Sequence, residues 1–79
     1  MDLQDTIEMM LSDNYKERFK AEYYQTKIRY DKLQDMVDNW AHLDFEPILA
    51  REIYLLQLKI MKAYLVLLEF RAKAEKIEL

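Results

Sequence analysis

The stretch LQLKIMKAYLVLLEFRAK, residues 56–73, decides the fold. Its apolar side chains recur every three or four residues, which is the spacing of one face of an α-helix. Continued in both directions, the pattern predicts a helix over residues 47–77. Pro47 suits the first turn of this helix, and Asp44 or Glu46 is placed to cap its start.

Two apolar stripes run along this predicted helix, each advancing by four and three residues in alternation, as in a coiled coil. The first stripe consists of Leu49, Ile53, Leu56, Ile60, Ala63, Leu67, Phe70, Ala74 and Ile77. The second stripe consists of Tyr54, Leu58, Met61, Leu65, Leu68 and Ala72. One stripe is enough to pack against another helix of the same chain. We therefore expect the second stripe to face a neighbouring protomer.

The preceding sequence predicts two further helices. Residues 15–40 carry an apolar seam with the same alternation, and Asn14 with Glu17 is typical of a capping box at the start. The seam consists of Phe19, Tyr23, Thr26, Tyr30, Leu33, Val37 and Trp40. Residues 2–11 predict a short amphipathic helix. Because a short connection makes the two long helices antiparallel neighbours, the expected fold is all-α, with a short N-terminal helix and a long two-helix hairpin in one domain, residues 1–79.

The composition favours a homo-oligomer. The chain has 79 residues, no cysteine and one histidine, His42, so it offers neither a disulfide nor a structural metal site. A small, apolar chain without such links usually completes its core by self-association. Glycine is absent, which excludes the glycine-rich loops that cradle phosphates in P-loop and dinucleotide-binding proteins.

The sequence predicts neither an enzyme nor a cofactor or metal site. No cysteine nucleophile exists, and no base lies near Ser12 in the sequence. The net charge of −3 argues against DNA and acidic membranes as partners. No uncharged run approaches the ~20 residues that span a bilayer, and no signal-peptide pattern is present. We expect a cytoplasmic protein.

One segment, residues 15–32, departs from the overall acidic balance. This segment contains six basic residues and only three acidic ones. The basic residues are Lys16, Arg18, Lys20, Lys27, Arg29 and Lys32. Two interpretations remain open. In one, the segment is an amphipathic helix whose basic stems cover its aromatic flanks. In the other, Tyr15 or Tyr24 stacks on a base while Lys27 or Arg29 contacts a phosphate.

The segments YKERFKAEY (15–23), IRYDKL (28–33) and LQLKIMKAYLVLLEFRA (56–72) resemble a group of small phage proteins. These proteins share a two-helix hairpin with the anti-CBASS and anti-Thoeris nucleotide sponges. The resemblance implies an oligomer that binds cyclic oligonucleotide second messengers between protomers, cleaves nothing, and so keeps a bacterial immune effector silent.

The resemblance also implies site residues. An aromatic residue near the start of the hairpin corresponds to Tyr15, and a basic residue further along corresponds to Arg29, with Lys27 as the alternative. Lys16 or Arg18 would hold a further phosphate of a cyclic di- or trinucleotide. Two other hypotheses stand beside this one: a helical adaptor that inhibits a host or phage protein through its apolar stripe, and a purely structural, self-assembling hairpin.

Overall fold

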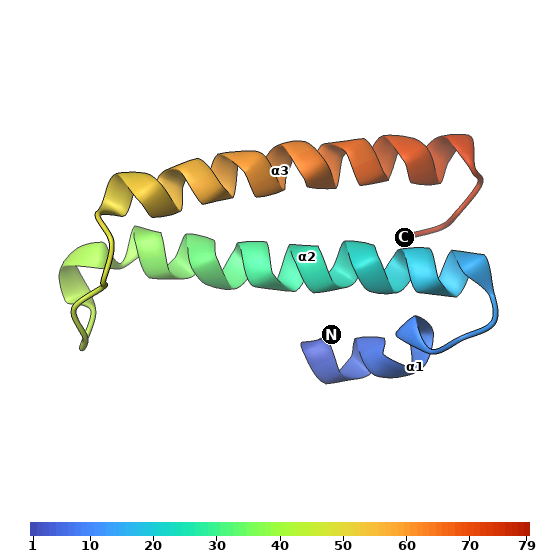
Figure 1. Ribbon diagram of the computed structural model, residues 1–79, viewed down its shortest axis with the longest axis horizontal. Helices are drawn as coiled ribbons and strands as arrows, with labels where there is room; N and C mark the ends of the chain where they lie inside the picture. The colour runs from blue at the N-terminus through green and yellow to red at the C-terminus, as the bar shows by residue number, and fades with distance from the viewer.

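The computed structural model describes residues 1–79 and is all-helical (Figure 1). Its elements are a 3-10 helix η1 (Leu3–Thr6), α1 (Ile7–Met10), α2 (Tyr15–Asp38), a second 3-10 helix η2 (Trp40–His42) and α3 (Arg51–Ala74). The two long helices form the predicted antiparallel hairpin. No helix is both long enough and apolar enough to cross a membrane.

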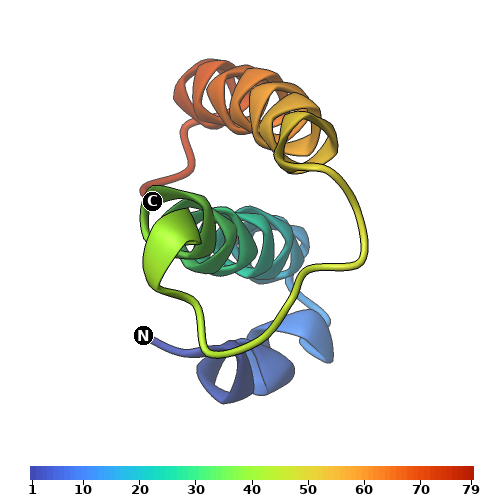
Figure 2. The same ribbon diagram turned by 90° about the vertical axis from the view of Figure 1, so that its left-hand side faces the viewer.

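The helices lie in three layers. Seen along the hairpin, α2 lies between α3 on one side and the short η1–α1 segment on the other (Figure 2). No element covers the outer side of α3, and the N-terminal segment covers only the first part of α2 (Figure 1). The molecule is accordingly elongated, with extents of 42 × 24 × 16 Å.

The N-terminal segment is less regular than the predicted helix over residues 2–11. It forms one 3-10 turn and one α-helical turn, and Asp2 and Asp5 cap its start reciprocally. Thr6 is buried and accepts a hydrogen bond of 3.1 Å from the Gln25 amide of α2. Ala21 of α2 is buried as well. The contact between Thr6 and Gln25 fixes the short segment on the side of α2 that α3 leaves open.

The predicted start of α2 is confirmed. The Asn14 side chain accepts a hydrogen bond of 2.9 Å from the backbone N–H of Lys16, which satisfies one of the free donors of the first turn. The reciprocal half of the predicted capping box is wrong, since Glu17 pairs instead with Lys20 at 3.4 Å. The helix ends at Asp38, two residues before the predicted end.

The predicted start of α3 is wrong by four residues. The helix begins at Arg51, and its N-cap, Ala50, makes no side-chain hydrogen bond. Asp44 and Glu46 therefore do not cap it, and Pro47 lies in the connection. Ala50 is still extended, with φ of −64° and ψ of 149°, so the helix starts only at Arg51.

The C-terminal end of α3 is closed by a Schellman motif. Lys76 adopts a left-handed conformation with φ of 58°, and the N–H of Ile77 donates to the carbonyl of Ala72 at 2.8 Å. The turn directs Ile77 back between the long helices, where it is buried. The last predicted turn, residues 75–77, is thus a cap and not a continuation of the helix.

The core lies between α2 and the second stripe of α3. The largest buried cluster consists of Phe19, Tyr23, Leu65, Leu68, Ala72 and Ile77. Leu65 is 1% exposed and Leu68 0%. The expectation that the second stripe faces a partner is therefore wrong, because this stripe packs on α2.

The first stripe is the one left uncovered. We call its helical part the outer stripe; it consists of Ile53, Leu56, Ile60, Ala63, Leu67, Phe70 and Ala74, all exposed. Phe70 is 72% exposed. At about 100° per residue, the two stripes are about 150° apart around the helix axis. A helix that is apolar on two nearly opposite faces requires cover on both.

Replacing Lys76 by glycine should stabilise the fold. A left-handed residue with a β-carbon costs roughly 1–2 kcal/mol, and glycine relieves this cost but loses more conformational entropy on folding. We expect a net gain of about 0.5–1 kcal/mol in the free energy of unfolding, measured by urea denaturation. Lys76→Ala is the control, because it removes the same ammonium group but keeps the β-carbon. An equal gain in both variants would contradict the conformational explanation.

Candidate anion-binding site

An open hollow of about 560 Å³ lies where α2 begins and α3 ends. Because the hairpin is antiparallel, residues about 60 positions apart meet there. Its lining residues are Asn14, Lys16, Glu17, Lys20, Ala72, Lys73, Lys76, Ile77 and Glu78. We call this feature the basic hollow, since four lysines and two glutamates contribute to it.

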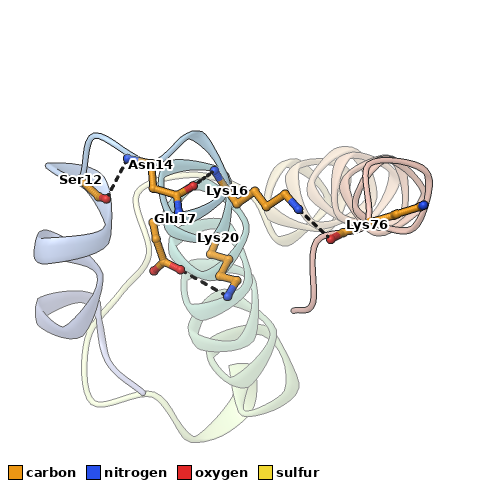
Figure 3. Close-up of polar contacts among 6 residues, drawn as sticks. All are labelled: Ser12, Asn14, Lys16, Glu17, Lys20 and Lys76. Atoms are coloured by element: carbon orange, nitrogen blue, oxygen red, sulfur yellow. Dashed lines mark hydrogen bonds and ion pairs between the residues drawn. The ribbon is translucent and has the colours of Figure 1, made fainter.

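Two of the four lysines have partners within the protein. The Lys16 ammonium group reaches across to the backbone carbonyl of Lys76 at 3.3 Å, and Lys20 pairs with Glu17 (Figure 3). The ammonium groups of Lys73 and Lys76 form no hydrogen bond or ion pair. The Lys76 side chain extends away from the hydrogen bond between the Lys16 ammonium group and the Lys76 carbonyl (Figure 3). The hollow therefore carries positive charge that the protein itself does not neutralise.

Tyr15 lies beside the basic hollow in a polar cluster with the last turn of α3. Its hydroxyl donates to Glu75 and accepts from Arg71 at 2.9 Å. Arg71 also donates to Glu75 at 3.0 Å and lies over the Phe19 ring at 5.0 Å. The cluster holds the Tyr15 hydroxyl in place, while the residue remains 47% exposed. A tyrosine held in this way presents part of its ring to a flat ligand at little entropic cost.

The cluster shifts the pKa values of its three members. The hydrogen bond from Tyr15, followed by that from Arg71, lowers the pKa of Glu75. The same bond to Glu75 raises the pKa of Tyr15, and the bond to Glu75 also raises that of Arg71. At neutral pH the cluster therefore contains a carboxylate and a guanidinium, and it adds no net charge to the hollow.

Arg18 has a structural partner. Its guanidinium donates to the backbone carbonyl of Ser12 at 2.9 Å, which ties α2 to the turn that precedes it. It points toward the N-terminal segment and does not line the basic hollow. Of the predicted site residues, only Lys16 thus lines the basic hollow, and Tyr15 lies beside it.

The other three predicted site residues lie further along α2. Tyr24 packs edge-on against Tyr23, with 5.3 Å between ring centroids, and belongs to the flank of the core. Lys27 pairs with Asp31 at 3.0 Å. Arg29 is exposed and has no partner. Fourteen residues separate Tyr15 from Arg29, which is roughly 21 Å along the helix, so one protomer does not bring them to a single phosphate.

Three lysines of the basic hollow, Lys20, Lys73 and Lys76, were not predicted as site residues from the sequence. The sequence does indicate that basic residues meet here, because an antiparallel hairpin brings the C-terminal segment RAKAEKIEL, residues 71–79, beside the start of the 15–40 helix. The position of Lys76 depends on the Schellman turn. A left-handed lysine in a chain without glycine gives no recognisable sequence pattern for such a turn.

The Sequestin family model matches residues 13–74, which cover both long helices. The chain belongs to the Sequestin family. No curated protein and no solved structure matches it. Membership of the Sequestin family fits a protein that binds and sequesters a ligand, and it points away from catalysis. The hollow is compatible with this role, because lysine ammonium groups around an open depression are suited to charge-assisted hydrogen bonds with an anion.

Burial of Tyr23, together with its hydrogen bond to Glu69, should make the fold sensitive to alkaline pH. Burial, followed by this bond of 2.6 Å, raises the pKa of Tyr23 to about 12. The stabilisation is therefore complete below the unfolded pKa of 10.0 and is lost as the pH rises toward 12. In Tyr23→Phe, the melting temperature should fall less steeply above pH 10 than in the wild type.

The matched control for this experiment is Tyr54→Phe, which removes a hydroxyl without a hydrogen-bond partner. It should follow the wild-type pH profile, measured by circular dichroism. If the Tyr23→Phe and Tyr54→Phe profiles coincide, the Tyr23–Glu69 pair does not cause the alkaline loss.

Proposed function

We propose that this protein is a phage anti-defence sponge, which sequesters a cyclic di- or trinucleotide immune messenger in the cytoplasm of an infected bacterium. Membership of the Sequestin family carries the proposal, since the match includes the helices that bear the basic and aromatic residues. The chain acts by mass action: when the dissociation constant lies below the protein concentration, little free messenger remains. The ligand is held intact, and the active form is a homo-oligomer.

The basic hollow supports a phosphate-binding role at the open end of the hairpin. Lys16, Lys20 and Lys76 offer ammonium groups from two elements, and charge-assisted hydrogen bonds to phosphate are among the strong polar contacts. Tyr15, with its hydroxyl fixed by Glu75, is available to stack on a base. Binding also neutralises Lys76, whose ammonium group has no partner in the free protein.

The remaining predicted residues would act in the oligomer. Lys27 and Arg29, with Tyr24 beside them, lie too far along α2 to share a phosphate with Tyr15 of the same protomer. A ligand held between protomers meets the start of one α2 and the middle of another. In this arrangement Arg29 contributes a second phosphate contact, and Arg18 holds the end of α2 in place.

The exposed outer stripe also supports a second candidate function, a helical adaptor that docks on a host or phage protein. The stripe has the 4–3 spacing that a partner helix recognises. The two functions predict different association states for the chain without a ligand or partner protein. An adaptor keeps the stripe available as a monomer, whereas a sponge with sites between protomers has it covered.

A panel of cyclic di- and trinucleotides should contain at least one that binds with a saturable calorimetric signal. It should also raise the melting temperature, because a ligand that binds only the native state stabilises it. Mass spectrometry after denaturation should recover the nucleotide unchanged. A panel that gives neither heat nor a thermal shift would rule out the sponge, and recovery of a linear product would rule out binding without cleavage.

Lys20→Met should weaken binding of the nucleotide found in this way by roughly 10- to 100-fold, the value of one charge-assisted hydrogen bond. Lys32→Met is the matched control, because it removes the same charge from an exposed position outside the hollow. Arg29→Ala tests the other end of the proposed site. Wild-type affinity in Lys20→Met combined with loss in Arg29→Ala would move the site away from the hollow.

A further inference from the structure

The outer stripe of α3 carries a heptad pattern over the whole length of the helix. Its a positions are Ile53, Ile60, Leu67 and Ala74, and its d positions are Leu56, Ala63 and Phe70. The g positions, which flank such a seam, are Glu52, Lys59, Val66 and Lys73. All four flanking residues are exposed. A strict a/d seam matches another helix with the same spacing. The α3 helix of a second copy has this spacing because its sequence is identical.

A parallel pairing of two α3 helices gains nothing from these flanking residues. It places each g position beside the e position of the next heptad in the partner. Glu52 then lies beside Gln57 of the partner subunit, and Lys59 beside Tyr64 of the partner subunit. No pair of opposite charges forms along the helix.

An antiparallel pairing with the two helices in full overlap gains two ion pairs. It places a positions opposite d positions, so that Ile53 meets Phe70 of the partner subunit and Leu56 meets Leu67 of the partner subunit. The small Ala63 meets Ile60 of the partner subunit at the centre, next to the two-fold axis. Along the flanks, Glu52 lies opposite Lys73 of the partner subunit, and two-fold symmetry repeats this pair.

Shifts by one heptad are unfavourable. In one direction Lys59 lies opposite Lys59 of the partner subunit, and in the other direction it lies opposite Lys73 of the partner subunit. Both shifts place like charges together and leave one end of each outer stripe exposed. Only full overlap pairs Glu52 with a lysine while leaving Lys59 beside an apolar residue, Val66 of the partner subunit.

We propose that the outer stripe is a self-association surface, on which α3 of a second copy packs antiparallel, with Glu52 of each copy paired with Lys73 of the other. This inference rests on the homo-oligomeric part of the proposed function and not on the nucleotide. Its test therefore uses the ligand-free chain, so that failure of nucleotide binding and failure of this interface are separate results.

Charge exchange tests both the orientation and the register. Glu52→Lys and Lys73→Glu each turn two attractive pairs into two repulsive ones. Each should raise the dissociation constant from sedimentation equilibrium at least about tenfold. The double variant Glu52→Lys/Lys73→Glu restores both pairs and the original net charge, so its dissociation constant should return to within about threefold of wild type.

Lys59→Glu is the matched control for Lys73→Glu, since it makes the same charge change about two helical turns away from the proposed pair. In the proposed register it faces Val66 of the partner subunit and should change the dissociation constant by no more than about threefold. Circular dichroism establishes that every variant is folded, which is expected because all three positions are exposed.

Three results would overturn the inference. The first is a double variant that associates no better than the single variants, and the second is a Lys59→Glu variant that is as weak as Lys73→Glu. Either of these outcomes means a different register or orientation. The third is a wild-type chain that stays monomeric at high concentration, which would mean that the outer stripe does not bind a second copy.

Discussion

The structure depends on a helix that is apolar on two nearly opposite faces. Burial of Leu65 and Leu68 against α2 satisfies only one of these faces of α3. The chain has no third long helix for the other, and the N-terminal segment packs on the far side of α2 (Figure 2). Phe70 and its neighbours therefore remain in solvent within one protomer. Because a hydrophobic face of this length is costly to leave exposed, the outer stripe has the character of an interaction surface.

Polar contacts between the helices accompany the face of α3 that turns inward. Tyr23 donates to Glu69, Tyr64 donates to Glu22, and Tyr15 donates to Glu75. All three pairs flank the second stripe, and rotation of α3 by about 150° would break them all. Each pair joins a hydroxyl to a carboxylate, which is a strong class of hydrogen bond at the edge of a core. The second stripe supplies the burial, and these pairs are formed only when that stripe faces α2.

The periodicity of the sequence predicted the helical hairpin and its seam, because spacing reports directly on which residues share a helix face. Spacing could not tell which stripe faces inward, since both have the same period. The choice depends on partners distant in sequence, such as Glu69 for Tyr23. The candidate site was predictable only in part for the same reason. Tyr15 and Lys16 lie in one conspicuous segment, whereas Lys76 reaches the basic hollow through a turn at the other end of the chain.

The proposed pairing has a consequence for where ligands bind. Two-fold symmetry places the two basic hollows at opposite ends of an α3 pair, because each hollow lies at the C-terminal end of its own α3. A helix of 24 residues is roughly 36 Å long, so the two sites are too far apart to share one cyclic dinucleotide. Each hollow then lies near the start of the partner's α3 and not beside the middle of the partner's α2, so the proposed contact with Arg29 requires a second interface, between α3 pairs. Lys73, between the hollow and the outer stripe, links the two features: its pairing with Glu52 of the partner subunit leaves Lys16, Lys20 and Lys76 as the ammonium groups available to phosphate.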